Sequence, residues 1–322
     1  MRSSLTILEA LLAAIMATAQ ASPTKTPDAS PGGQAQGQSS PQNVAPGNAQ
    51  AQPSSGGNRV LQAKSQDELK AYQDASAKTD PAETEAAADA FAAKYPNSEM
   101  KGTLYVRAMN IYAQANNGEK VIEAGRKAIA ADPTNPLPLV QVASVLAETT
   151  RDTDLDREQR LVEAAKDAQA AIDNINTGLI VPPKASPERV AAAKATILTM
   201  AYDTLGMVNM NKKDFAAAEQ VLLKAADASK GNPEAVIYLR LSVAQDQLKQ
   251  YRQALDSANK AVQYAPQGSA AQSLAKQQQA RVQKLIDAGP TSSPATPAAA
   301  APVPTKQATQ PTTQAQPATP PH

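Results

Sequence analysis

Alternating acidic side chains near the middle of the chain have the spacing of a metal-binding loop. Asp152, Asp154 and Asp156 are each separated by one residue, and Glu163 stands at the twelfth place counted from Asp152. Carboxylates at such places bind calcium in a twelve-residue loop whose sixth place is glycine. Here the sixth place holds Arg157, and two interpretations stay open. The chain is a calcium-responsive module through the Asp152 loop, or these carboxylates begin a helix, since negative charge stabilises a helix N-terminus.

Residues that could catalyse a reaction are few. The sequence contains no cysteine, and its single histidine is His322 in a proline-rich stretch. Histidine-dependent acid–base and nucleophilic schemes therefore have no base, and thiolate chemistry and disulfides are excluded. No glycine-rich phosphate loop is present either. We expect a protein that is not an enzyme and has no cofactor.

The charge balance argues against nucleic acid as a partner. Lys and Arg number 31 against 30 Asp and Glu, which leaves a formal net charge of +1. A nucleic-acid-binding domain normally carries a basic face or stripe. We expect a protein or peptide partner instead.

One pattern of large and small residues is written twice between Ala201 and Pro266, and Tyr238 follows Tyr202 by 36 residues. The first copy has Tyr202, Leu205, Gly206, Ala218 and Ala225 at its marked places. The second copy has Tyr238, Leu241, Ala254, Ala261 and Pro266. A fixed period of this size indicates a repeat architecture.

Each copy contains two runs of helical apolar spacing with a polar break between them, at Asn211–Asp214 and at Lys249–Gln250. Large residues lie on the first run and alanines on the second, which lets two helices approach closely. Glycine inside a helix costs about 1 kcal/mol relative to alanine, and we expect Gly206 to lie where the two helices are closest.

These residues resemble the tetratricopeptide repeat, which places an aromatic, a Leu-Gly pair, two alanines and a closing proline over roughly 34 residues. An earlier copy carries Tyr105, Tyr112, Ala128 and Pro133, with Met109 where the family prefers glycine. A divergent unit lies between Leu137 and Ile175 and contains an insertion after Thr149. The segment FAAKYPNSEM, residues 91–100, resembles the second-helix ending of repeats in bacterial envelope assembly proteins.

The resemblance implies an all-α fold, a tetratricopeptide-like α-solenoid of antiparallel helix pairs over residues 65–288. Asp80-Pro81 and Ser186-Pro187 each predict a helix start, since a capping side chain precedes a proline at the first helical position. The stretch from Ser186 to Asn211 is either one long helix or two units joined without a turn. The glutamine- and lysine-rich stretch from Ser269 to Asp287 is typical of a C-terminal capping helix.

The two ends of the chain differ from the rest in composition. Residues 1–21 have the layout of a secretory signal peptide, with Arg2 before an apolar run and small residues at the cleavage place. Residues 22–64 and 289–322 are rich in Pro, Gly, Ser, Gln and Ala, which predicts a disordered linker and a disordered tail. We expect export to the periplasm, with membrane contact only through the transient signal; Glu9 in the apolar run leaves a cytoplasmic location as the alternative.

The resemblance also implies that the first helix of each pair lines a concave groove that holds a peptide. It assigns Met200, Asp203, Met207 and Met210 to that groove, and methionine suits adaptable apolar contacts. The alternative is that a neighbouring helix covers the methionines. Relatives that grip a carboxyl terminus carry lysines and asparagines where this chain has Val106, Asp203 and Leu239, so a carboxylate clamp is not expected. The further candidates for partner contacts are Asn110, Arg107, Arg240 and Leu239.

We therefore expect a non-catalytic scaffold that binds a partner peptide or helix in its groove, in cell-envelope assembly. A second hypothesis is a structural component that self-associates in the envelope without binding a peptide. The calcium-responsive module through the Asp152 loop is the third.

Overall fold

The computed structural model describes residues 59–289, and all the regular structure in this part of the chain is helical. The predicted signal peptide, most of the predicted linker and nearly all of the predicted tail lie outside the described residues. The helices are α2 (Gln66–Ser76), α3 (Pro81–Lys94), α4 (Lys101–Gln114), α5 (Gly118–Ala131), α6 (Pro136–Thr149), α7 (Arg157–Asp173), α8 (Pro187–Asn211), α9 (Phe215–Ala228), α10 (Ala235–Gln247), α11 (Tyr251–Tyr264) and α12 (Ala270–Asp287).

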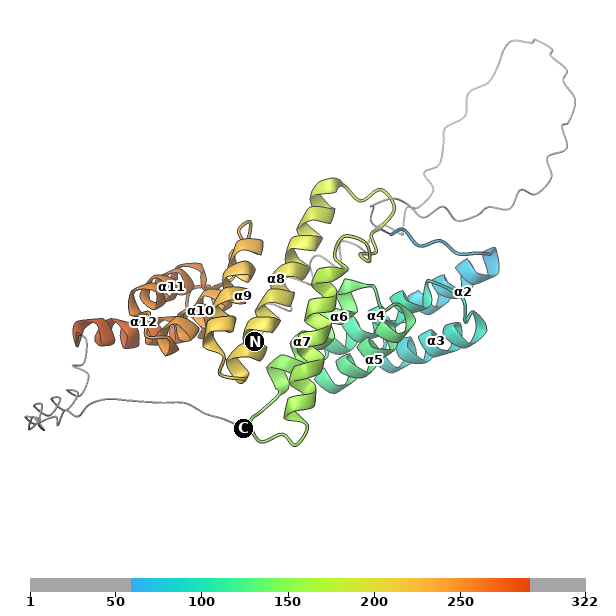
Figure 1. The fold of residues 1–322 in the computed structure, drawn as a ribbon. Coiled ribbons are helices and arrows are strands. Elements are labelled where there is room, and N and C mark those ends of the chain that lie inside the picture. The colour runs from blue at the N-terminus through green and yellow to red at the C-terminus, as the bar shows by residue number, and fades with distance from the viewer. Residues whose placement is uncertain (1–58, 290–322) are drawn as a thin grey trace, which may run out of the picture.

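Each helix packs mainly against its neighbours in sequence, and the helices follow one another from α2 at one end to α12 at the other (Figure 1). The main departure is a direct contact between α6 and α8, which brings two first helices of successive pairs together. Apolar side chains form four separate buried clusters along this stack. This one-dimensional arrangement is that of an α-solenoid of helix pairs, as predicted.

Side-chain caps begin the helices where the sequence predicts them. The Asp80 carboxylate accepts a hydrogen bond from the Glu83 backbone N–H at 3.0 Å, and the Ser186 hydroxyl accepts one from Arg189 at 3.4 Å. Ser186 caps α8, which is a single helix of 25 residues from Pro187 to Asn211. The structure therefore decides between the two interpretations of this stretch.

The turns inside three of the pairs share one backbone geometry. Asn116, Lys213 and Lys249 have left-handed φ values of 55°, 62° and 61°. Each lies just before the residue whose N–H bonds back to a first-helix carbonyl, as in Asp214 to Asn209 at 2.9 Å. A single left-handed residue reverses the chain in each pair, which confirms the predicted breaks near residues 211–214 and 249–250.

Gly206 lies at a close approach between α8 and α9, as expected. A Cβ atom added there would lie 2.5 Å from a terminal methyl group of Leu222, which is fully buried. Any larger residue would require the Leu222 side chain, or α9 itself, to shift.

A lysine of the second helix lies over a tyrosine of the first in the same three pairs. The Nζ atoms of Lys127, Lys224 and Lys260 lie 5.8, 5.7 and 5.6 Å from the ring centroids of Tyr105, Tyr202 and Tyr238. These cation–π contacts tie the two helices of each pair together at one register.

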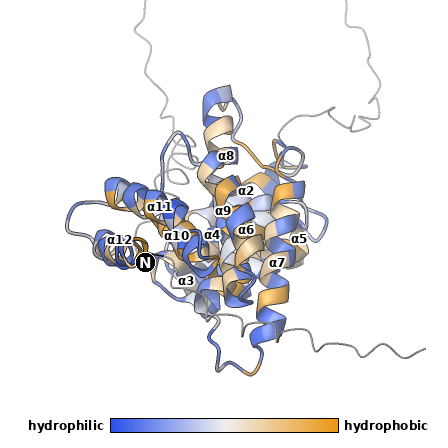
Figure 2. Cartoon of the chain, turned by 60° about the vertical axis from the view of Figure 1, so that its left-hand side comes forward, coloured by the Kyte–Doolittle hydropathy of each residue, from blue (hydrophilic) through white to orange (hydrophobic). Residues whose placement is uncertain are grey.

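The last helix, α12, packs against α10 and α11 and ends the described stack. Ala275 and Val282 are its buried contacts, whereas most of its other side chains are polar (Figure 2). Arg281 forms an ion pair with Asp246 of α10, a carboxylate that is almost entirely buried. An apolar inner side and a polar outer side are what a capping helix requires.

Candidate partner-binding face

The predicted contact residues come from the first helices of the pairs, α4, α8 and α10. Between α4 and α8 lies a fourth first helix, α6, from which the sequence analysis named no residue. We call the surface that these four helices share the first-helix face. Its residues fall into an amide pair on α4 and α6 and a charged junction where α6, α8 and α10 meet.

The amide pair joins Asn110 of α4 to Gln141 of α6. The Gln141 amide nitrogen donates to the Asn110 side-chain oxygen at 3.2 Å. Gln141 is 8% exposed, and its own amide oxygen is buried without a hydrogen-bond partner in the described part of the chain. A buried acceptor without a partner is rare and costs about 1–3 kcal/mol, so this group calls for an explanation.

Arg107 of α4 is used differently from its neighbour Asn110. Its guanidinium donates to the Lys78 backbone carbonyl at 2.8 and 3.3 Å, in the segment that follows α2. Arg107 therefore ties α4 to the preceding pair, and the structure does not bring it to the other candidates.

The three methionines of α8 pack toward two different neighbours. Met207 is 7% exposed within the cluster that contains Leu146 of α6, and Met200 is half-buried beside the cluster around Val140. Met210 is half-buried on the other side, against the α9–α10 cluster. The methionines fill the spaces between pairs, and their role in binding a partner stays a prediction.

The charged junction is built on an ion pair between two candidate residues. Arg240 of α10 donates to one carboxylate oxygen of Asp203 of α8, and the two side chains are 23% and 15% exposed. The other oxygen of Asp203 is buried and has no partner in the described residues. Leu239, half-buried, precedes Arg240 on the same helix.

Two glutamates flank this ion pair. Glu148 on α6 is exposed, yet partial desolvation raises its pKa, and the negative charge of Asp203 raises it further against the opposing effect of Arg240. Burial likewise raises the pKa of Glu234, just before α10, and Asp203 adds to the increase while Arg240 opposes it. Both glutamates thus lie within electrostatic range of the ion pair.

Three residues of this face were missed from the sequence: Gln141, Glu148 and Glu234. Gln141, Ser144 and Glu148 are spaced three and four residues apart, which places them on one side of α6. That spacing was visible in the sequence. The contacts that make it informative, to Asn110 on α4 and toward Asp203 on α8, come from other pairs.

Carboxylates of the Asp152 loop accept hydrogen bonds from nearby residues of the same segment. Arg157 donates to Asp152 at 3.2 Å, and the Arg151 backbone N–H donates to Asp154 at 2.8 Å. Within residues 59–289, no group of three or more His, Asp or Glu side chains is placed to hold a metal ion. The helix α7 begins at Arg157, after this loop.

None of the helices within residues 59–289 combines enough length with enough apolar character to cross a bilayer.

Comparison with known proteins identifies part of the chain. The family described as tetratricopeptide repeat matches residues 201–232 and 235–267. No curated protein sequence matches the chain.

Solved structures similar to this chain include a MamA double mutant, at 16% identity and a TM-score of 0.38, covering 58% of this chain and 95% of that one. MamA from residue 41 onward, from Desulfovibrio magneticus RS-1, is 15% identical with a TM-score of 0.35 and coverages of 59% and 97%. Acl4, an assembly chaperone of RpL4, is 10% identical with a TM-score of 0.35 and coverages of 69% and 98%.

Proposed function

We propose that this chain, whose residues 201–232 and 235–267 match the tetratricopeptide repeat, binds a partner polypeptide across its first-helix face. Such repeats are protein-interaction scaffolds, and their stacked pairs create an extended surface. The partner is an extended peptide or a helix of another protein. Binding, rather than a chemical step, carries the effect.

The observation that carries this proposal is the stack of helix pairs, whose first helices bear partly exposed polar and apolar side chains in several pairs. Asn110 of α4, Met200 of α8 and Leu239 of α10 are each half-buried. A peptide main chain can bond to partly exposed amides, and its side chains can cover the apolar groups.

A matched pair of substitutions tests the proposal. Leu239→Glu places a charge on the first-helix face, whereas Leu223→Glu places one on α9, where the leucine is 46% exposed. After crosslinking in the native cell and mass spectrometry, we expect Leu239→Glu to lose the partners of the wild type and Leu223→Glu to keep them. Circular dichroism melting should be similar for both.

Two results would contradict this assignment of the binding face. One is unchanged crosslinking by Leu239→Glu with normal folding. The other is equal loss of partners by Leu239→Glu and Leu223→Glu, since the effect would then not depend on which side of the solenoid is charged.

We also propose that the protein works in the cell envelope after export. The proposal is supported by the composition of residues 1–21, a basic start, an apolar run and small residues before the predicted cleavage place. Mass spectrometry of the N-terminus in cell fractions tests it. We expect a processed N-terminus in the periplasmic fraction; an intact N-terminus found in the cytoplasm would contradict export.

Self-association in the envelope is a second candidate, and exposed apolar side chains on other surfaces favour it. Leu155 in the Asp152 loop is fully exposed, and Val162 on α7 is 53% exposed. Sedimentation should then give a mass that rises with concentration and that falls in Val162→Asp. A monomer at every concentration would remove this candidate.

A further inference from the structure

A short extended segment precedes α2, and we call it the strap (residues 59–64). Its odd-numbered residues are half-buried and its even-numbered residues are exposed. Such alternation is typical of an extended chain that lies with one face against a surface. Leu61 and Ala63 supply the apolar part of the covered face, since they pack against the buried cluster that α2, α3, α4 and α5 share.

The C-terminal end of the strap is held at the start of the stack. The Lys64 backbone N–H donates to the Glu68 carboxylate of α2 at 2.6 Å, and Glu68 is buried. The Lys64 ammonium donates to the Asn97 carbonyl at 2.8 Å, in the turn between α3 and α4. These bonds fix the place where the strap meets α2.

The N-terminal end of the strap lies farther along the stack. The Arg59 backbone N–H donates to the Leu179 carbonyl at 3.0 Å, and the Arg59 carbonyl accepts from the Val181 N–H at 2.9 Å. These two bonds form a parallel bridge to Ile180, in the loop between α7 and α8. In Figure 1 the strap is the blue trace that runs from α2 toward this loop.

The Arg59 side chain adds a charged anchor at a second place, the turn between α5 and α6. Its guanidinium donates to the Asp132 carboxylate at 2.7 Å and to the Thr134 hydroxyl at 3.1 Å. The Asp132 side chain is only 10% exposed, and its other oxygen accepts from that hydroxyl at 2.8 Å. Hydrogen bonds between charged groups are roughly twice as strong as neutral ones, and Thr134 orients this acceptor toward Arg59.

The loop and the turn that receive Arg59 are packed directly on each other. A Cβ atom added to Gly178 would lie 1.8 Å from the Thr134 carbonyl oxygen, so glycine is required for the two backbones to approach this closely. Arg59 thus contacts both through one site, with its backbone on the loop and its guanidinium on the turn.

These contacts are unusual for a solenoid, in which each pair contacts mainly its neighbours and nothing distant resists bending between pairs. The strap joins the start of α2 to the α5–α6 turn and to the α7–α8 loop, which are not neighbours of α2 in the stack. Beyond Lys64 its anchors are nevertheless few: the charged contacts of Arg59, two backbone bonds and two half-buried apolar side chains. Segments with so few buried contacts open locally at a lower free energy than the core.

We propose that the strap is a conformational clamp. When closed, it sets the curvature of the stack from α2 to α8. When open, it releases Arg59 from the loop and the turn together, and the pairs bend independently. The first helices α4, α6 and α8 lie within this span, so the closed clamp holds one shape of the first-helix face. That last consequence rests on the proposed function, whereas the clamp itself does not.

Spin labels test whether the strap opens. The chain contains no cysteine, so introduced cysteines can be labelled without background. Gln62→Cys reports on the strap and Thr177→Cys on the α7–α8 loop, and both native side chains are exposed. In the full chain, double electron–electron resonance should give one narrow distance distribution, and Arg59→Ala should add longer distances. Exchange of the Val181 amide hydrogen, measured by NMR, should become at least tenfold faster in Arg59→Ala.

Two neighbouring residues on opposite faces of the strap provide the matched control. Leu61→Asp should open the strap, because it puts a charge against the apolar cluster, whereas Val60→Asp should leave it closed, because Val60 is 44% exposed. Arg59→Lys should restore the closed distance, since one guanidinium nitrogen makes both side-chain bonds and an ammonium can replace it. Circular dichroism should show the same helix content in all these variants.

A second pair of labels tests the curvature itself. Gln73→Cys on α2 and Ala192→Cys on α8 replace exposed residues at the two ends of the clamped span. Their distance distribution should be narrow when Arg59 is present and broader in Arg59→Ala.

Three results would overturn the inference. The first is an unchanged strap distance in both Arg59→Ala and Leu61→Asp. The second is equal opening by Leu61→Asp and Val60→Asp, since the effect would then not depend on the covered face. The third is an unchanged distribution between α2 and α8 although the strap has opened. None of these measurements includes a partner, so they stand apart from the crosslinking of Leu239→Glu that decides the proposed function.

Discussion

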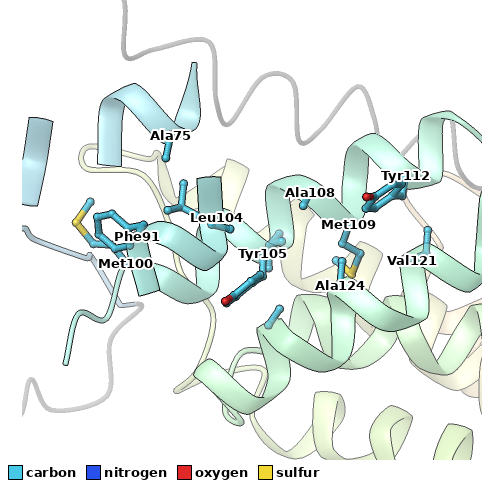
Figure 3. Packing of buried hydrophobic residues seen from close by; sticks show 13 residues of the cluster. Ala75, Phe91, Met100, Leu104, Tyr105, Ala108, Met109, Tyr112, Val121 and Ala124 are labelled. Atoms are coloured by element: carbon cyan, nitrogen blue, oxygen red, sulfur yellow. The ribbon is translucent and has the colours of Figure 1, made fainter. Parts of the chain in front are cut away.

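The pairs α4–α5 and α8–α9 solve the same packing problem with opposite residues. In α8–α9 the first helix supplies Gly206 and the second supplies Leu222. In α4–α5 the first helix supplies Met109, and the equivalent of Leu222, 97 positions earlier, is Gly125. A Cβ at Gly125 would lie 3.1 Å from the Met109 sulfur and closer still to Val142 of α6. Figure 3 shows Met109 directed toward α5, beside Ala124.

This exchange explains why Met109 stands where the repeat family prefers glycine. The contact requires one large side chain facing one missing side chain, and either helix can supply the large one. The third pair, α10–α11, uses Ser242 and Ala258 at the corresponding places, both fully buried. A helix-pair contact is thus a property of two positions together.

The same two pairs differ in their polar contacts. In both, a lysine lies over a tyrosine, Lys127 over Tyr105 and Lys224 over Tyr202. Only in α4–α5, among the residues described, does the lysine also reach carboxylates of the preceding helix, with Nζ 2.8 Å from Glu85 and 3.0 Å from Asp89 of α3. Glu85 also accepts a hydrogen bond from Tyr112 at 2.7 Å. The α4–α5 pair is therefore tied to α3 by a lysine that serves a tyrosine and two carboxylates together, whereas the ion pair between α8–α9 and α10 uses other residues, Asp203 and Arg240.

The largest expected effect comes from giving the α8–α9 contact the residues of the α4–α5 contact. Gly206→Met alone should destabilise the chain by about 3 kcal/mol, because the added side chain overlaps Leu222. Leu222→Gly alone should cost about 4 kcal/mol, from the cavity and the helical glycine. The double variant should cost at least about 2 kcal/mol less than the sum. Urea unfolding measures the cycle.

Gly231→Ala is the control for that cycle, since a Cβ there meets no atom within 4 Å. Strict additivity of Gly206→Met and Leu222→Gly would break the comparison, because the two pairs would then not be exchangeable solutions of one contact.

A smaller effect tests the polar difference between the pairs. Glu85→Ala should cost about 2 kcal/mol at pH 7, because it leaves the buried Tyr112 hydroxyl without its acceptor. Lys224→Ala in the other pair removes an exposed cation–π contact and should cost at most about 1 kcal/mol. Equal losses of unfolding free energy in urea would show that the carboxylates of α3 add nothing to stability.

Acid titration also tests the contribution of Glu85 to stability. Burial alone would raise the pKa of Glu85, but the hydrogen bonds from Lys127 and Tyr112 outweigh it and lower the pKa below 4.5. The stability that Glu85 contributes is then present above pH 4.5 and lost as pH falls through its folded-state pKa. The difference between wild type and Glu85→Ala should shrink over that range.

The pair between these two, α6–α7, should show the opposite dependence of stability on pH. Burial, followed by the charge of Glu163, raises the pKa of Asp167 from 3.8 to about 6. Its favourable contribution is present below pH 3.8 and is lost as pH rises to about 6, since the unfolded chain releases the proton first. Melting temperatures of Asp167→Asn from pH 4 to 7 should fall less than those of wild type. Parallel curves would contradict a perturbed Asp167.

The smallest effect concerns the turns. Asn116 and Lys213 occupy the same left-handed position, which asparagine tolerates better than lysine. Lys213→Asn should stabilise the chain by about 0.5 kcal/mol, and Asn116→Lys should destabilise it by a similar amount. A stabilising Asn116→Lys, measured by urea unfolding, would show that side-chain contacts rather than backbone conformation decide this position.

Much of the fold was readable from local patterns. The repeat spacing, the caps at Asp80 and Ser186 and the polar breaks predicted where helices begin and turn. Gly206 was correctly expected at a close approach. The spacing could not predict the role of Gly125. Its partner Met109 was compared only with the family's preference for glycine, and not with the residue that faces it on the second helix.

The candidate face was readable only in part. Asp203, Arg240 and Asn110 were named from their places on the first helices, and the structure puts Arg240 on Asp203 and Asn110 on Gln141. Glu148 and Glu234 were not named, since nothing in the sequence relates α6 to α10. The methionines of α8 were assigned to a groove, and the structure packs them between pairs.

By itself, the sequence determined that this protein is a row of helix pairs, because helix period and turn residues are local properties. The tertiary structure alone decided which carboxylates meet, which polar atoms are left unsatisfied and which methionines are covered. Those outcomes depend on how far each pair rotates against the next, and that rotation is set by contacts between side chains far apart in the chain.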